Sequence, residues 1–341
     1  MAARWRPFWC SRAEICVVLI TYQPKLRERL CFYPVESVSH KHLAPLHWPP
    51  ELPKALLPGA SLYFSEKSNA VLDFHGSVQD PDLVIFMAGN QYRVFPDLLL
   101  TFREWVRRQP GHRSVKVDRI FYATTPPGRL IDAMQSGQLV LGNFRFDVQP
   151  DKLWPEVFMT EARQQLRLLN AHYIEGWSVF ARNKGTVLLV RAGNPKNIHG
   201  VSDLLRDDVR VAISSPTREP ASFESYSNTL RAQGGAQFPD LLLKKPSTIS
   251  PAIVHHRENP QFIYDGKADV APMYYHFGDY LKTRLPRDFD YVSLPAEGNF
   301  RDELAISTIR NAQHKAAAAA WVEFIRSDAA ATVDRVYSAR L

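Results

Sequence analysis

The chain has 341 residues, of which 45% are hydrophobic and 23% charged, and its formal net charge is +7. This length can build one large core or two modest ones, so we expect two lobes. Residues 1–60 hold eight Lys and Arg residues against four acidic residues, which leaves the rest of the chain nearly balanced. Because no basic stripe with interleaved aromatic residues occurs, the sequence argues against a nucleic-acid partner.

The first 60 residues contain all three cysteines, Cys10, Cys16 and Cys31, without the C-x-x-C spacing of a zinc site. Residues 15–20 form an apolar run behind three arginines, which faintly resembles a secretory signal, but no small-x-small cleavage pattern follows it. The run is far shorter than the about 20 apolar residues of a membrane span. A processed signal, a disordered tail and a wrongly assigned start therefore all stay open.

Five prolines in residues 44–60 interrupt any helix and predict a linker. We therefore expect residues 1–70 to be a poorly ordered extension. Deletion of residues 1–60 should then leave soluble folding and binding intact.

The chain then repeats a strand, a turn and a helix. Residues 82–87 are a short apolar run, 88–91 a tight turn, and 96–106 an amphipathic helix with apolar residues on one face. The pattern recurs as a strand at 115–121, a turn at 124–128 and a helix from 130. A third unit is predicted to run from residues 140–146 into a helix over 157–169.

The second half continues the alternation with strands at 185–190, 209–213, 269–274 and 303–309, and with helices at 202–205, 223–232 and 316–325. Alternating strands and helices predict mostly parallel sheets with helices outside. In such sheets a ligand meets the carboxyl ends of the strands. The expected class is therefore α/β, with binding residues in the turns that follow strands.

Polar donors stand in three of these turns, directly before predicted helices. A helix N-terminus offers unpaired N–H groups and about half a positive charge, so hydroxyl and amide groups placed there can hold an oxyanion. Each hydroxyl could equally be an ordinary helix cap. The candidate residues are Gly89, Asn90 and Gln91; Thr124 and Thr125; and Ser214, Ser215 and Ser222.

The densest polar cluster of the body is His255-His256-Arg257-Glu258. His255 and Arg257 are candidates for contact with an acidic solute, and a surface loop is the competing interpretation. Adjacent residues seldom face the same way, so we do not expect both histidines to bind one metal ion. No metal or cofactor is predicted.

The order and spacing of four stretches resemble type II periplasmic-binding-protein domains, in the branch that includes molybdate-binding proteins of uptake transporters. The stretches are residues 82–91, 120–128, 187–222 and 263–275, and the final helix over 320–330 matches the tail of such domains. The resemblance implies a two-lobed fold with a cleft between the lobes. Lobe I would comprise 71–185 and 277–341, and lobe II 186–276, with crossings near 184–186 and 275–277.

The resemblance also implies a periplasmic or otherwise extracytoplasmic monomer that captures a small anionic solute and meets an ABC transporter permease. Tyr274 stands where the molybdate-binding branch usually has a tyrosine in the cleft, although a core tyrosine is the alternative. That branch has serines where this chain has Asn90, Gln91, Thr124 and Thr125. The ligand is thus an oxyanion such as molybdate, tungstate or sulfate, or a small acidic organic solute.

No catalytic residues are predicted, because the chain contains no Gly-x-Ser-x-Gly elbow, no phosphate loop ending in Gly-Lys-Ser/Thr and no His-Glu-x-x-His helix. Two alternatives to uptake stay open at this point. One is a cytosolic small-molecule sensor, and the other is an enzyme on the same fold.

Overall fold

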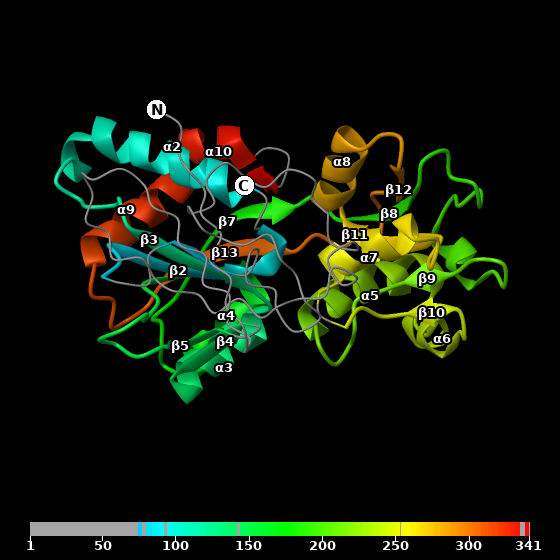
Figure 1. Cartoon of the computed structure of the whole chain (residues 1–341), viewed down its shortest axis with the longest axis horizontal. Coiled ribbons are helices and arrows are strands. Elements are labelled where there is room, and N and C mark those ends of the chain that lie inside the picture. Colours follow the sequence, from blue (N-terminus) through cyan, green and yellow to red (C-terminus); the bar gives the residue numbers. More distant parts are fainter. Residues whose placement is uncertain are drawn as a thin grey trace, which may run out of the picture.

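The computed structural model describes residues 74–76, 80–91, 94–141, 144–252, 254–334 and 338–340. The predictions for residues 1–70 lie outside these residues. The described chain forms two lobes, each containing one main β-sheet with helices against it (Figure 1). Blue, cyan and red segments share one lobe, so lobe I combines the beginning and the end of the described chain. Within the described ranges, every helix is too short or too polar to span a bilayer.

The sheet of lobe I has the strand order β1-β3-β2-β6-β13-β7-β14. Strands β2, β3, β6 and β7 run in one direction, so their carboxyl ends lie at one edge. Strand β13 runs the opposite way between β6 and β7, because it brings the chain back from lobe II. The bounds are β1 Phe74–Gly76, β2 Leu83–Ala88, β3 Ile120–Thr125, β6 Val157–Glu161, β7 Ser178–Asn183, β13 Glu303–Thr308 and β14 Ser338–Arg340.

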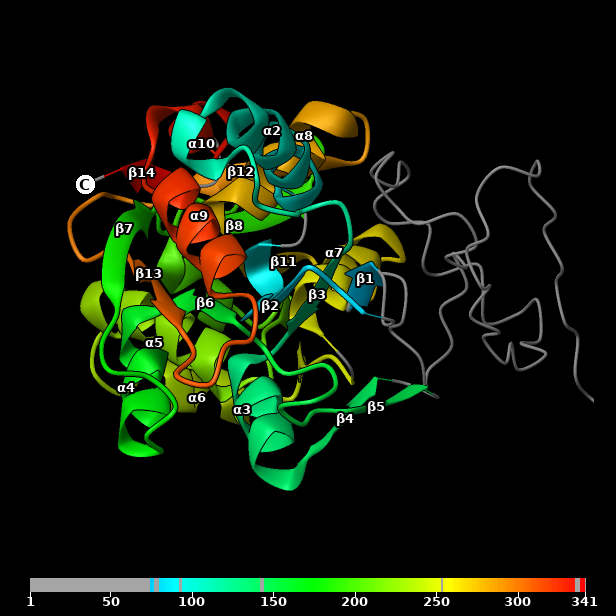
Figure 2. The ribbon, with the colours of Figure 1, turned by 90° about the vertical axis from the view of Figure 1, so that its left-hand side faces the viewer.

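Two layers of helices cover this sheet, because strand side chains alternate between its faces. Leu83, Ile85 and Met87 of β2 pack with one set of helices, while Val84 and Phe86 pack with the other. In Figure 2, α2, α9 and α10 lie over one face, and α3 and α4 lie at the other. The bounds are η3 Gly89–Gln91, α2 Phe95–Arg108, η4 Pro110–His112, α3 Pro127–Ser136, the hairpin β4 Gln138–Leu141 and β5 Phe144–Asp147, α4 Ala162–Asn170, α9 Lys315–Ile325 and α10 Asp328–Asp334.

The sheet of lobe II has the order β10-β9-β11-β8-β12, and only β8 runs against the others. Strand β8 starts beside lobe I, so it runs away from the interlobe edge while the other strands run towards it. The strands are β8 Thr186–Arg191, β9 Val211–Ala212, β10 Thr248–Ile249, β11 Val270–Tyr274 and β12 Phe289–Ser293. The helices are η5 Val201–Leu205, α5 Pro220–Gly234, α6 Phe238–Lys244, α7 His255–Tyr264 and α8 Tyr275–Arg284.

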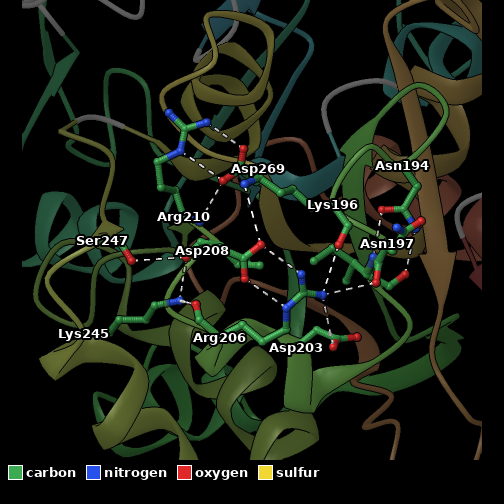
Figure 3. Close-up of polar contacts among 12 residues, drawn as sticks. Asn194, Lys196, Asn197, Asp203, Arg206, Asp208, Arg210, Lys245, Ser247 and Asp269 are labelled. Atoms are coloured by element: carbon green, nitrogen blue, oxygen red, sulfur yellow. Dashed lines mark hydrogen bonds and ion pairs between the residues drawn. The ribbon is translucent and has the colours of Figure 1, made fainter.

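The far end of lobe II is tied together by charged side chains that bind backbone carbonyls (Figure 3). The ammonium group of Lys245 lies 2.6–2.7 Å from the carbonyl oxygens of Leu204, Arg206 and Val209. Arg210 and Asp269 form a bidentate ion pair between two neighbouring strands. These contacts give lobe II a polar base at the end opposite to lobe I.

The chain passes between the lobes twice. The first passage is at Lys184 and Gly185, between β7 and β8. The second lies at 294–302, not at the expected 275–277, because β12 pairs with β8 along its whole length and α8 packs its Phe277 and Leu281 into the lobe II core.

Further details of the sequence-based prediction are wrong. The strand expected at residues 115–121 is β3 at Ile120–Thr125, so Thr124 and Thr125 end the strand and do not stand in the turn after it. Residues 157–161 form strand β6 and not the start of a helix, since the apolar run there is buried on both faces of the sheet and α4 begins only at Ala162. The sheets are mixed and not mostly parallel, because β13 and β8 each pair antiparallel with both neighbours. The α/β class with helices flanking the sheets is confirmed.

Candidate functional site

The first two predicted turns of lobe I lie side by side at the interlobe edge. Strands β2 and β3 are parallel neighbours, with Ala88 opposite Thr125, so η3 begins directly beside the end of β3. Asn90, Gln91, Thr124 and Thr125 are all buried. Two turns that are separate in the sequence therefore present their polar groups at one place.

Lobe II contacts lobe I at these turns. A Cβ atom placed on Gly89 would lie 3.3 Å from Cε1 of His256 and 3.6 Å from Cα of Thr125. The next residue, Asn90, places its carbonyl oxygen 2.9 Å from Nε2 of His276, which follows β11. The absence of a side chain at Gly89 thus lets a histidine of the opposite lobe approach the turn.

The third predicted turn follows β9 in lobe II. Ser214 and Ser215 are buried, and the hydroxyl of Ser215 accepts a hydrogen bond from the N–H of Arg218 at 3.3 Å. Ser222 lies half-buried in the first turn of α5. The hydroxyl of Ser214 finds no hydrogen-bond partner among the described residues, and the same holds for Nε2 of Gln91 in lobe I.

His255 stands at the first position of α7 and is almost fully buried. Its Nδ1 lies 2.9 Å from Oε1 of Glu219, the residue that precedes α5, and its backbone N–H donates to Oε2 of the same carboxylate at 2.7 Å. Its Nε2 lies 2.7 Å from the hydroxyl oxygen of Tyr226. Arg257, two residues further along α7, is also buried. The competing interpretation of a surface loop is therefore wrong, because these residues form a buried helix start.

Tyr274, the last residue of β11, is also buried. Its hydroxyl donates to Oγ of Ser225 at 3.2 Å, and its ring stacks on that of His276 with 5.7 Å between centroids. Burial, followed by the charges of Asp302 and Glu161, raises the pKa of this tyrosine well above its usual range. Tyr274 therefore remains a neutral donor at the interlobe boundary.

Sequence reasoning missed a charged network that joins the lobes around Ser225. Arg163, near the start of α4, donates from Nη2 to Oγ of Ser225 at 2.6 Å and to the carbonyl of Ala221 at 2.7 Å. Its Nη1 lies 2.9 Å from Glu224, and Nη2 lies 3.4 Å from Asp302. Because residues 157–161 were predicted as helix, Glu161 was not recognised as the end of a strand, nor Arg163 as a residue just after it.

The network contains more buried carboxylates than cations. Burial and the nearby charge of Glu161 raise the pKa of Asp302 to about 6, although Arg163 opposes this shift. Burial alone would lower the pKa of Arg163, but Asp302 and Glu161 together raise it. Asn90 connects this network to the first turn, because its Nδ2 donates to Oε1 of Glu161 at 3.0 Å.

A cavity of about 700 Å³ opens beside this network. Its lining comes from both lobes and from the second passage between them, including Glu161, Arg163, Asn228, Asn299 and Asp302. The space lies between two bodies connected by two passages, so its volume depends on how closely the lobes approach.

A family model described as bacterial extracellular solute-binding protein matches residues 83–336. No curated protein sequence is significantly similar to the chain. The proteins of this family and the structural neighbours are substrate-binding transport proteins and not enzymes.

Several solved structures share the fold. The sulfate-binding protein SubI from Mycobacterium tuberculosis has a TM-score of 0.55 at 18% identity over 75% of this chain and 85% of that chain. The substrate-binding domain of a putative molybdenum ABC transporter from Clostridium difficile has a TM-score of 0.53 at 17% identity, over 76% and 98%. Iron-bound HitA from Pseudomonas aeruginosa has a TM-score of 0.54 at 13% identity, over 76% and 85%. The family model spans most of the chain and agrees with the two-lobed fold, so the chain belongs to the bacterial extracellular solute-binding proteins.

Proposed function

We propose that the solute of this protein is a small anion, held where the turns after β2, β3 and β9 meet between the lobes. As a member of its family the chain is a solute-binding protein of the ABC-transporter type. The anion, its site and the compartment are the proposed part. The main support is one observation: Gln91 of lobe I and Ser214 of lobe II each bury a hydrogen-bond donor that finds no acceptor among the described residues.

Buried donors without acceptors are costly, about 1–3 kcal/mol each, so native proteins rarely keep them without a purpose. A ligand with acceptor oxygens would satisfy both. The amide of Gln91 and the hydroxyl of Ser214 suit sulfate-like oxyanions and carboxylates equally well. The proposed ligand class is therefore defined by its acceptor oxygens and negative charge, not by one central atom.

Helix starts add to the attraction for an anion. Thr124 and Thr125 precede α3, Ser214 and Ser215 precede α5, and His255 begins α7. Each helix N-terminus contributes partial positive charge and unpaired N–H groups. The further predicted contacts are Gly89, Asn90, Ser222, Arg257 and Tyr274.

A binding screen with matched variants tests this proposal. Thermal shift and calorimetry are run with molybdate, tungstate, sulfate, phosphate and small organic acids, and binding is expected for at least one anion. Gln91→Ala and Ser214→Ala should each weaken that binding about 10–100-fold, as expected for a lost hydrogen bond to a charged group. The matched controls Gln135→Ala and Ser202→Ala change exposed residues outside the site and should bind like wild type.

The proposal fails if no anion binds, or if binding occurs but both site variants match their controls. Binding of ferric ion without any anion would also contradict it.

We further infer that the protein is located in the periplasm, is a monomer and has a permease as its partner. Fractionation of a tagged protein should place it with periplasmic markers, and recovery in the cytosol would contradict that inference.

A further inference from the structure

A buried group of potential metal ligands lies in lobe II at the starts of two helices. Glu219 precedes α5, and His255 and His256 form the first turn of α7. One ligand atom from each residue lies within 4.8 Å of the other two, and the three residues are 4%, 1% and 4% exposed. The consecutive histidines thus converge, although their adjacency in the sequence argued against a shared ion.

The geometry of the two rings explains this convergence. Successive side chains on a helix are about 100° apart, so adjacent residues can both border a point beside the helix end. The ring of His256 stacks on Phe277 with 5.1 Å between centroids and an interplanar angle of 15°. The ring of His255 stands nearly perpendicular to the ring of His256, with 5.4 Å between their centroids. Packing therefore holds both imidazoles in place.

The carboxylate of Glu219 is balanced by no Lys or Arg side chain of the described residues. Both of its oxygens contact His255, one at the ring nitrogen and one at the backbone N–H. Among the described residues, no Lys or Arg side chain comes within ion-pair distance of it. A buried carboxylate without a fixed countercharge is costly, and a bound cation would remove that cost.

We propose that Glu219, His255 and His256 bind a divalent first-row transition-metal ion. Two imidazoles and one carboxylate are a donor set that suits Zn²⁺, Fe²⁺ and Co²⁺. Two ligand atoms on a tetrahedral ion are roughly 3.3 Å apart for bonds of about 2.0–2.1 Å. Nδ1 of His255 and Oε1 of Glu219 are 2.9 Å apart, so only a small displacement is needed to admit the ion between them.

Tyr226 supplies the outer contact that a metal-bound histidine requires. When Nδ1 of His255 binds the ion, the ring proton is carried by Nε2, which donates to the hydroxyl oxygen of Tyr226 2.7 Å away. The backbone N–H of Tyr274 donates to that same oxygen at 3.2 Å. The orientation of the ring is thereby linked to the carboxyl end of β11.

The site faces lobe I without including any residue of it. Cε1 of His256 lies 3.3 Å from the Cβ position of Gly89, at the interlobe contact. Three protein ligands leave one position of a four-coordinate ion for water or a second ligand. Because all three protein ligands belong to lobe II, the ion should bind without the anionic solute. The metal proposal and the anion proposal can therefore fail independently of each other.

The test measures metal binding by the full chain, purified through a tag without histidine and with its cysteines alkylated. Calorimetry with Zn²⁺ and the visible absorption of Co²⁺ are recorded without any anion from the solute screen. Wild type should bind one ion. The substitutions His256→Ala, His256→Gln and Glu219→Gln should each lower the affinity for that ion at least about tenfold. Melting curves in EDTA identify variants that fold like wild type.

His314→Ala is the matched control. His314, whose side chain is 40% exposed, pairs with the buried Glu156 in lobe I, and no third metal ligand joins this pair among the described residues. This variant should bind the ion like wild type. The proposal is overturned if wild type binds neither ion, if folded His256 variants bind as tightly as wild type, or if His314→Ala loses binding to the same extent.

Discussion

Nη2 of Arg163 in lobe I lies 2.6 Å from Oγ of Ser225 in lobe II, within a network that also includes Asp302. The side chain of Arg163 is 22% exposed, so solvent only partly screens these contacts. Because Ser225 lies on α5 and Asp302 ends the second passage, a single guanidinium connects both lobes and the segment between them. This network therefore holds the two lobes in contact.

Removal of the guanidinium should loosen the lobes. Arg163→Met leaves Asp302 and Glu224 without their shared cation and should cost about 1–3 kcal/mol in the free energy of urea unfolding. Small-angle scattering of this variant should give a larger radius of gyration. Arg167→Met is the control, because Arg167 lies on the same helix but pairs with the exposed Asp132 within lobe I. Equal effects of the two substitutions would contradict a special role for Arg163.

The elevated pKa of Asp302 predicts a pH dependence of defined sign. Burial raises this pKa from 3.8 to about 6, so the folded state favours the protonated carboxyl. The stabilising contribution is complete below pH 3.8 and is lost as the pH rises through about 6. It corresponds to about 3 kcal/mol. Urea unfolding from pH 3.5 to 7 should show Asp302→Asn gaining stability relative to wild type as the pH increases, and a constant difference would exclude this.

Much of the fold could be predicted from the sequence, because the apolar residues of several elements recur with a clear strand or helix period. The apolar run that became β2 and the one-sided helix α2 appear where expected. Strand β6 was missed because its apolar residues Val157, Phe158 and Met159 face two cores, and such a run shows neither alternation nor helical spacing. The second passage was misplaced because the pairing of β12 with β8 is a tertiary contact without a local signature.

The site was only partly predictable for a related reason. Polar residues near the ends of strands are visible in the sequence, and in the structure Thr125 is the buried last residue of β3, while the buried Ser214 follows β9. The partners Glu219 and Tyr226 of His255 are 36 and 29 residues away, and no spacing rule connects them. Residues that bind each other across the fold become recognisable only once the helices are packed.

The polar base of lobe II offers a stability prediction that is independent of the solute. Lys245→Met leaves three carbonyl groups without their common donor and should cost about 1–3 kcal/mol. Lys244→Met is the matched control, because Lys244 is adjacent to Lys245 in the sequence but its side chain is exposed. Urea unfolding should separate the two variants, as the contacts in Figure 3 suggest. If both unfold alike, Lys245 contributes no net stabilisation.

A single methyl group at Gly89 should test whether the first turn and His256 must meet for the lobes to close. The Cβ atom of Gly89→Ala would lie 3.3 Å from Cε1 of His256 and 3.4 Å from the carbonyl oxygen of Thr124, closer than most such contacts. Within lobe I the nearest atom is the carbonyl oxygen of Thr124 at 3.4 Å, which requires little adjustment, so lobe I should still fold, whereas the tightest contact is with the histidine of lobe II. We therefore expect an unfolding free energy within about 1 kcal/mol of wild type and a solute affinity at least about tenfold lower. The double variant Gly89→Ala/His256→Ala should recover part of that affinity, since it removes the obstructing ring. If the single variant binds like wild type in calorimetry, contact between these two residues does not limit closure.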